Sequence, residues 1–206
     1  MTILRERFPE GLKSLKDPVD ALYAQGDAHL LQKRAVCIVG TRRPTTYGLI
    51  QCRNIVEKLK SRDIVIVSGF ALGIDACAHQ SALELGISSI AVLGCSLETD
   101  YPKAHRKLRQ AMLQAGHLFL TEYPRGSGVR PENFPKRNRI LAAMSEDVII
   151  VQCSIRSGTM NTAAHAMSLG KNLWVVPGNI DEPMSRGPNW LIFQGANPLY
   201  DLDEQL

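Results

Sequence analysis

Six short apolar runs rich in β-branched residues constrain the fold of this chain more than any other feature. They lack the alternation of a half-exposed strand, and segments with helical spacing separate most of them. Such runs are typical of strands buried on both faces, and helical connections between them favour a parallel sheet. The sequence therefore predicts an α/β fold with a doubly wound, mostly parallel sheet. The predicted strands begin with AVCIV at residue 35 and continue with IVIV, SIAVL, HLFL, DVIIV and NLWVV.

The sequence predicts a lead-in and one main domain. Residues 1 to 34 are polar, contain Pro9 and Pro18 as breakers, and favour a short helical lead-in. Residues 35 to 206 form a single predicted domain, because no linker, repeat or low-complexity stretch divides them. At the end of the chain, LYDLDEQL favours a last short strand and an acidic tail.

Several classes of protein are disfavoured by the composition. No run approaches the roughly 18 apolar residues of a membrane span, and the N-terminus lacks a secretory signal pattern, so we expect a cytoplasmic protein without a membrane partner. The five cysteines form no CxxC pair, and several lie inside apolar runs, which predicts reduced packing residues rather than metal ligands or disulfides. We expect neither a metal nor a cofactor.

Positive charge is concentrated in one segment. The net charge is +4, and residues 125 to 139, RGSGVRPENFPKRNR, carry five cationic side chains against one carboxylate, whereas the rest of the chain is neutral overall. This concentration predicts a local anionic partner. Lys136, Arg137, Asn138 and Arg139 follow Pro135 at the predicted start of a helix. Cations at that end oppose the helix dipole and therefore indicate a nearby anion, the alternative being a solvated helix end.

Four of the predicted strands are followed closely by glycine, at Gly40, Gly69, Gly94 and Gly178. In open parallel sheets ligands bind outside the carboxyl ends of the strands, where glycine admits them to the backbone. The first turn, GTRRPTTYG, has neither the GxGxxG nor the GK[ST] pattern. It offers Thr41, Arg42 and Arg43 at the start of a helix, a mixture suited to a phosphate. Tight turns and a capped helix with solvated arginines are the alternatives.

The turn after the second strand contains Ser68 and Gly69 and leads to Asp75 and His79, which lie one helical turn apart. Such a pair can orient a base for acid–base chemistry. Because no plausible nucleophile accompanies it, a structural hydrogen bond that closes the loop is the favoured interpretation.

The segments GTRRPTTYG, SGFALGIDACAH, AVLGCSLETDYP, NFPKRNRILAAMS, RSGTMNTA, VVPGNI and GPNWLIFQGA together resemble, in order and spacing, the core of the DNA-processing protein A (DprA/Smf) family. The resemblance covers residues 8 to 201. It implies an extended Rossmann-like fold with helices on both faces of the sheet. It also implies a homodimeric protein without catalytic turnover that binds and protects single-stranded DNA and helps load the RecA recombinase onto it during natural transformation.

The resemblance also implies a DNA-binding site, in which Arg42 contacts a phosphate and Phe134 is available to stack on a base. The predicted DNA-binding residues are Gly40, Thr41, Arg42, Arg43, Ser68, Gly69, Phe134, Lys136, Arg137, Asn138, Arg139, Arg156, Ser157, Gly158 and Thr159. Two departures limit the comparison. Leu72 stands where the family usually has arginine, and we expect the C-terminal winged-helix-like domain of the family to be absent.

Two other functions are compatible with this fold. A nucleotide phosphoribohydrolase of the "lonely guy" type uses the glutamate of a PGGxGTxxE turn, but the corresponding turn here, CSIRSGTMNTA, has Thr162 at that position. Without a carboxylate there, the glycosidic chemistry has no support. A sensor protein would bind a free nucleotide in the same cleft. Five cations in one short segment exceed what a mononucleotide needs, and they favour a chain of phosphates.

Overall fold

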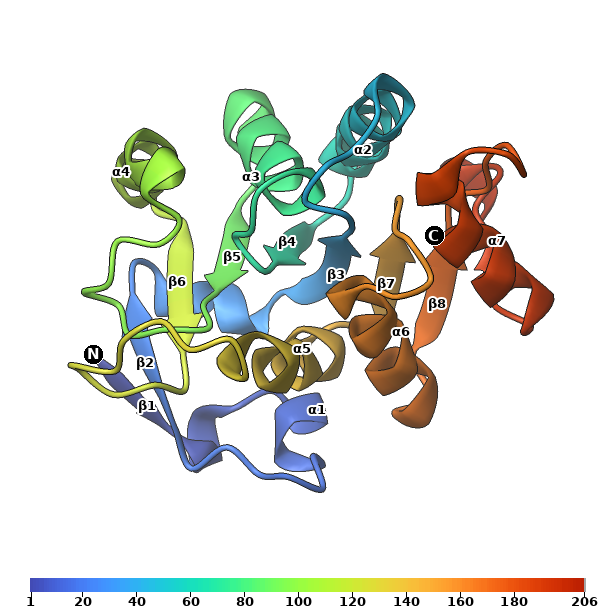
Figure 1. Ribbon diagram of the computed structural model, residues 1–206. Helices are drawn as coiled ribbons and strands as arrows, with labels where there is room; N and C mark the ends of the chain where they lie inside the picture. The colour runs from blue at the N-terminus through green and yellow to red at the C-terminus, as the bar shows by residue number, and fades with distance from the viewer. Residues whose placement is uncertain (206) are drawn as a thin grey trace.

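The computed structural model describes residues 1–205, which form a nine-stranded sheet flanked by helices (Figure 1). The strands are β1 (Thr2–Leu4), β2 (Ala21–Gln25), β3 (Arg34–Val39), β4 (Ile64–Ser68), β5 (Ser89–Val92), β6 (Leu118–Thr121), β7 (Asp147–Ile150), β8 (Asn172–Val175) and β9 (Asn197–Pro198). The helices are α1 (Glu10–Lys13), α2 (Thr46–Lys58), α3 (Ile74–Leu85), α4 (Arg106–Gln114), α5 (Asn133–Met144), α6 (Gly158–Ser168), α7 (Arg186–Phe193) and α8 (Leu202–Gln205). No helix in this part of the chain is both long and apolar enough to cross a bilayer.

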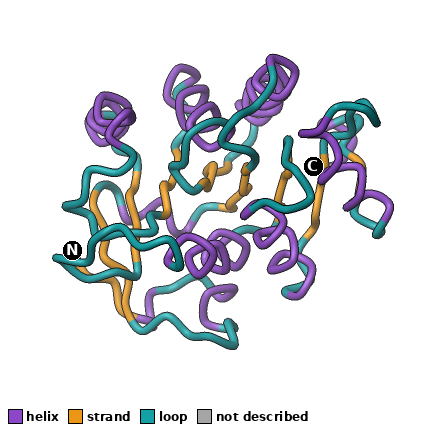
Figure 2. Tube along the Cα trace, viewed as in Figure 1, coloured by secondary structure: helices purple, strands orange, loops and turns teal. Residues whose placement is uncertain are grey.

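The strand order is β1-β2-β6-β5-β4-β3-β7-β8-β9, and the strands from β3 to β9 pair in parallel. All six strands predicted from the apolar runs are present, and β4 to β7 are buried along their whole length. Figure 2 shows the strands as a layer between helices. Helices α2, α3 and α4 cover one face, and α1, α5 and α6 cover the other (Figure 1). The prediction of a doubly wound α/β fold is thus confirmed.

The first 34 residues differ from the prediction. They include only one short α-helix, and two of their segments are strands: β1 pairs antiparallel with β2, and β2 pairs antiparallel with β6. Ile3 and Leu22 are buried in the same apolar cluster as residues of α5 and β6. The segment is therefore part of the sheet rather than a helical lead-in. The predicted last strand was also misplaced, because β9 ends at Pro198 and the acidic LDEQ segment is helical.

Packing on the two faces explains why the sheet is stable. One apolar cluster joins β3, β4 and β7 to α2 and α3, and another joins the opposite face to α1, α5 and α6. The five cysteines are buried and free, as their positions in apolar runs predicted. Burial of continuous apolar strands on both faces leaves the loops at the strand ends as the accessible surface for a ligand.

Candidate functional site

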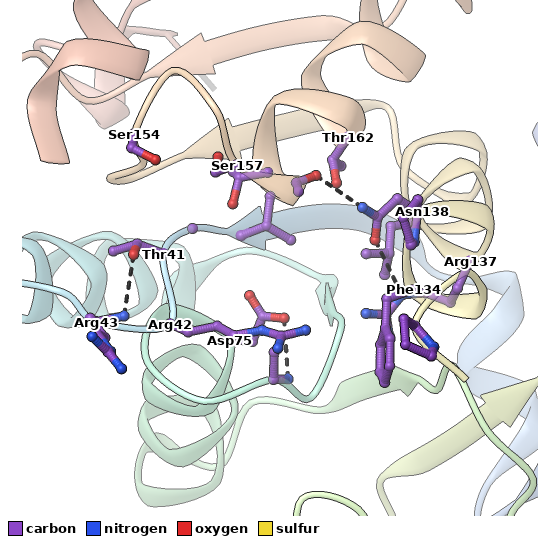
Figure 3. Close-up of a pocket in the computed structure, with 18 of the residues that line it drawn as sticks. Thr41, Arg42, Arg43, Asp75, Phe134, Arg137, Asn138, Ser154, Ser157 and Thr162 are labelled. Atoms are coloured by element: carbon purple, nitrogen blue, oxygen red, sulfur yellow. Dashed lines mark hydrogen bonds between the residues drawn. The ribbon is translucent and has the colours of Figure 1, made fainter. Parts of the chain in front are cut away.

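The topology of the sheet identifies one position for a ligand. From β3 the chain proceeds through β4, β5 and β6 on one side, and it then returns to place β7 on the other side of β3. In open parallel sheets ligands bind at this switch point, outside the carboxyl ends of the two central strands. A cavity of about 600 Å³ lies there (Figure 3). Its lining includes residues of the loops after β3, β4 and β7 and of the first turns of α5 and α6.

The loop between β3 and α2 is held in one conformation by close contacts. A Cβ on Gly40 would lie 2.6 Å from the Ile74 side chain and 2.9 Å from the carbonyl oxygen of Gln152, so only glycine fits. The Thr41 amide donates to the same carbonyl at 2.6 Å. The Arg43 amide donates to the Thr41 hydroxyl at 3.2 Å. All four residues predicted here, from Gly40 to Arg43, line the cavity, with the two arginines exposed.

Arg42 and Phe134 meet across this cavity. Figure 3 shows Arg42 extending past Asp75 toward the Phe134 ring, and its guanidinium carbon lies 5.4 Å from the ring centroid. This geometry is a cation–π contact, worth about 0.5 to 1 kcal/mol at an exposed site. Because Phe134 is only half-buried, the pair offers a cation and an aromatic surface to the same ligand.

Arg137 lines the cavity but is mainly structural. Its residue is only 4% exposed, and its guanidinium donates to the carbonyl oxygens of Gly69, at 2.7 Å, and Val92. Those carbonyls lie at the carboxyl ends of β4 and β5, so the hydrogen bonds of Arg137 connect α5 to that edge of the sheet. Because the guanidinium is buried and two of its hydrogen bonds go to these carbonyls, we assign Arg137 to the support of the cavity wall.

Asp75 supplies a carboxylate that the turn sequence alone did not place in the cavity. Its Oδ2 accepts a hydrogen bond from the Ala71 amide at 3.3 Å, which closes the loop after β4 as predicted. Burial raises the pKa of Asp75, against the lowering influence of the Arg137 guanidinium and the backbone amides. His79 does not complete an acid–base pair, because its Nδ1 lies 3.1 Å from the Ser89 hydroxyl instead.

Two predicted cations of the KRNR run turn to local carboxylates. Arg139 makes two hydrogen bonds of 2.8 Å to Glu122 and lies 3.0 Å from Asp17, and its side chain is only 5% exposed. Lys136 faces Asp17 at 4.0 Å. Lys136 and Arg139 share a helical face because they are three residues apart, and that face meets the N-terminal segment. Neither is among the described residues that line the cavity, so the structure does not bring these two predicted DNA-binding residues together with Arg42 there.

The predicted contacts in the turn after β4 are also corrected. Ser68 is fully buried and donates its hydroxyl to the Ile38 carbonyl at 2.6 Å. The Gly69 carbonyl is occupied by Arg137, and a Cβ on Gly69 would lie 2.6 Å from Asp75 Oδ2 and 2.7 Å from an Arg137 nitrogen. These residues support the cavity floor rather than offering groups to a ligand.

The start of α6, which together with its N-cap contains three of the four residues of the RSGT turn, supplies the far wall of the cavity. Ser157, Gly158 and Thr159 line it, whereas Arg156 is exposed on the surface nearby. The Asn138 side chain donates to the Gly158 carbonyl at 3.1 Å and ties α5 to α6. The first amides of a helix point outward and favour an anion through the helix dipole.

Sequence reasoning missed several residues of the site. Thr162 lines the cavity although only 2% of the residue is exposed, and its position four residues after Gly158 was a usable signal, since that spacing returns to the same helical face. Ser154 and Met184 also line it. Met184 lies in a separate short 3-10 helix (Pro183–Ser185), and no local pattern marks it as part of the site.

The fold and the cavity together define a class: a Rossmann-like protein whose switch-point cleft is walled by helix starts and carries exposed guanidinium groups. The chain belongs to the DNA recombination-mediator protein A family, whose sequence profile matches residues 1–206. It is 39% identical over 191 residues to protein Smf of Escherichia coli (strain K12), which is 93% of this chain and 51% of that protein. The chain thus spans about half the length of this relative.

Solved structures agree with the assignment to the family. DNA processing protein A (DprA) from Streptococcus pneumoniae superposes with a TM-score of 0.91 at 34% identity, covering 96% of this chain and 70% of that chain. DNA processing protein A from Helicobacter pylori, a protein studied for its single-stranded DNA binding mode, superposes with a TM-score of 0.90 at 36% identity. In that case 99% of this chain and 93% of the other are covered. The Rossmann-like fold implied by the sequence resemblance is therefore confirmed.

Proposed function

We propose that the switch-point cleft binds the phosphate backbone of single-stranded DNA. The observation that carries this proposal is the exposed Arg42 guanidinium 5.4 Å from the half-buried Phe134 ring, opposite the first turn of α6. A cation, free helix amides and an aromatic surface are the groups that sequence-tolerant binding of single strands requires. The similarity to the Helicobacter pylori protein, described for its single-stranded DNA binding mode, supports the same ligand here.

Phosphates and bases have separate partners in this proposal. Arg42 and Arg43 hold phosphates together with the amides of Gly158 and Thr159, whereas Phe134 stacks on an unpaired base. Stacking on an aromatic side chain contributes roughly 1 to 3 kcal/mol per base. Duplex DNA keeps its bases stacked on one another, so it loses this contribution and binds more weakly.

Binding of a free nucleotide is the main competing function. The cavity, of about 600 Å³, has a volume common for small-molecule sites. The five-cation argument against a mononucleotide is weaker than the sequence suggested, because Lys136 and Arg139 pair with carboxylates. The similarity to the Helicobacter pylori protein favours DNA, and direct competition between the two ligands distinguishes the functions.

Fluorescence anisotropy of labelled oligo-dT against salt tests the proposal. We expect a linear log–log dependence with a slope of about −0.7 for each phosphate neutralised. Competition by unlabelled single strand is expected to exceed that by duplex or by a mononucleotide. Arg42→Gln is expected to weaken binding. Lys60→Gln removes the same charge at the amino end of β4, on the side of the sheet away from the cleft, and is expected to leave binding unchanged. Equal competition by duplex, or by a mononucleotide at the same concentration, would refute the proposal.

We further propose that the protein helps load RecA recombinase onto the bound strand and acts as a homodimer, as the family resemblance implies. Support for self-association comes from α7, where Trp190 and Phe193 lie three residues apart and are 43% and 82% exposed. Exposed aromatic side chains on one helical face are typical of protein interfaces. Sedimentation velocity tests the homodimer, and Phe193→Asp is expected to convert a dimer to a monomer. A wild-type monomer at all concentrations would contradict it.

A further inference from the structure

A second, smaller depression adjoins the cleft and shares residues with it. It has a volume of about 30 Å³, and Arg42, Ala71 and Phe134 line both spaces. Its other walls come from the loop after β4 and from the loop after β5, including Leu72 and Tyr101. Because β4 and β5 are neighbouring parallel strands, both loops lie at the same edge of the sheet as the cleft. The accessible surface thus continues from the cleft toward α4.

The rim of this depression is apolar. The rings of Tyr101 and Phe134 lie 5.5 Å apart between centroids with an interplanar angle of 44°, and Leu72 is 44% exposed beside them. A space of about 30 Å³ holds only about two or three water molecules, so a nucleobase would lie across the rim rather than inside. A half-buried tyrosine next to an aromatic contact already assigned to a base offers a second stacking surface of the same kind.

Two lysines follow Tyr101 closely in the sequence. Lys103, in the 3-10 helix Lys103–His105, and Lys107, in α4, are exposed and lie one helical turn apart. Within residues 1–205 neither has a carboxylate oxygen within 4.0 Å, whereas neighbouring Asp100 is held by Arg106 at 3.0 Å. The other nearby acid, Glu98, lines a separate cavity together with Arg109. The Cα atoms of Tyr101 and Lys103 are at most about 6.7 Å apart, because the Tyr101–Pro102 bond is cis, so adjacent nucleotides can reach both.

We propose that a single strand leaving the cleft crosses Phe134 and Tyr101 and places its next phosphates on Lys103 and Lys107. The inference rests on the proposed function and extends the binding surface from the switch point to the start of α4. Bases lie on the apolar rim, and phosphates follow the cations on either side, from Arg42 to the two lysines. A short oligonucleotide fills the cleft alone, whereas a longer one occupies the whole path.

The experiment compares oligo-dT of about 5 and about 16 nucleotides, within the range of known single-strand site sizes. Anisotropy is recorded against salt for wild type, for Lys103→Gln/Lys107→Gln and for the control Lys60→Gln. Loss of two phosphate contacts is expected to reduce the salt slope of the double variant by about 1.4 with the long oligonucleotide, and to leave the short one unchanged. The control is expected to match wild type with both lengths.

Photocross-linking provides a readout that does not depend on a variant. Long oligo-dT carrying a single 5-iodouracil is expected to cross-link wild-type protein at Tyr101, as mapped by mass spectrometry. A wild-type protein that binds neither oligonucleotide would refute the proposed function and this extension with it. Binding by wild type with an unchanged salt slope in the double variant, or with no cross-link at Tyr101 from any position of the label, would overturn the extension alone.

Discussion

At the scale of single residues, the two arginines that sequence reasoning treated alike have different roles. The exposed Arg42 guanidinium lies over the face of Phe134, whereas Arg137 is 4% exposed and donates to two strand-end carbonyls. Removing a buried donor leaves its acceptors without partners, which costs more than the loss of a surface contact. Because of this difference in burial, replacing Arg42 is expected to change mainly ligand binding, whereas replacing Arg137 is expected to change mainly the stability of the fold.

We predict that Arg42→Ala weakens binding of oligo-dT by about 1 to 3 kcal/mol and lowers the free energy of unfolding by no more than about 1 kcal/mol, the range of an exposed cation–π contact. Arg137→Ala is expected to lower the free energy of unfolding by about 2 to 5 kcal/mol, because it also removes the cation near the buried Asp75 carboxylate. Urea unfolding and anisotropy on both variants check this. Equal stability of the two variants would contradict the assignment.

At the scale of secondary-structure elements, the six buried strands could be predicted because each is a continuous apolar run. The strands β1 and β2 could not, since they alternate in burial and lie in a polar segment interrupted by prolines. For the candidate site, glycines at strand ends indicated the edge of the sheet where the cavity lies. The directions of Lys136 and Arg139 depend instead on Asp17 and Glu122, distant in sequence, which no local pattern reveals.

The contact between the β5 loop and α5 gives a prediction at this scale. A Cβ on Gly94 would lie 2.9 Å from Phe134 Cδ1, so Gly94→Ala is expected to displace the ring without changing any charge. We expect oligo-dT to bind about 1 kcal/mol more weakly with the salt slope unchanged, because stacking is lost while phosphate contacts remain. Gly128→Ala is the matched control, since a Cβ there meets nothing within 4 Å. A reduced salt slope in Gly94→Ala would show that the loop positions phosphate ligands instead.

At the scale of the whole molecule, the cleft rests on a buried layer of histidines. The Ser89 hydroxyl lies between His79 Nδ1, at 3.1 Å, and His117 Nδ1, at 2.7 Å. His105 Nδ1 lies 3.3 Å from the carbonyl oxygen of Phe70, whose ring packs against His79 and His105. Phe70 has a φ of 57°, an uncommon conformation for a bulky residue, and it directly precedes the cavity-lining Ala71. The loop under the cleft therefore packs against buried imidazoles, and their burial favours the neutral form.

This layer makes the stability of the fold depend on pH. Burial, and then the neighbouring His117 and His105, lowers the pKa of His79 to about 3, and burial lowers the pKa of His105 and His117 as well. Because all three pKa values are lowered in the folded state, the unfolded chain binds more protons than the folded one as the pH falls below the unfolded value of about 6.5. The free energy of unfolding is thus expected to fall as the pH decreases below about 6.5. Each fully buried histidine contributes up to about 1.4 kcal/mol per pH unit.

Urea unfolding of the wild type between about pH 7 and about pH 5 measures this slope. Replacing His117 with Asn keeps a polar group beside Ser89 but removes one titrating imidazole, so the variant is expected to be less stable at neutral pH and to have a shallower pH dependence. The difference in slope separates titration from packing, because a purely structural loss shifts the curve without changing its gradient. A wild-type stability that does not change over this range would show that the histidine layer accepts protons in the folded state, and the proposed support of the cleft loop by neutral imidazoles would then be wrong.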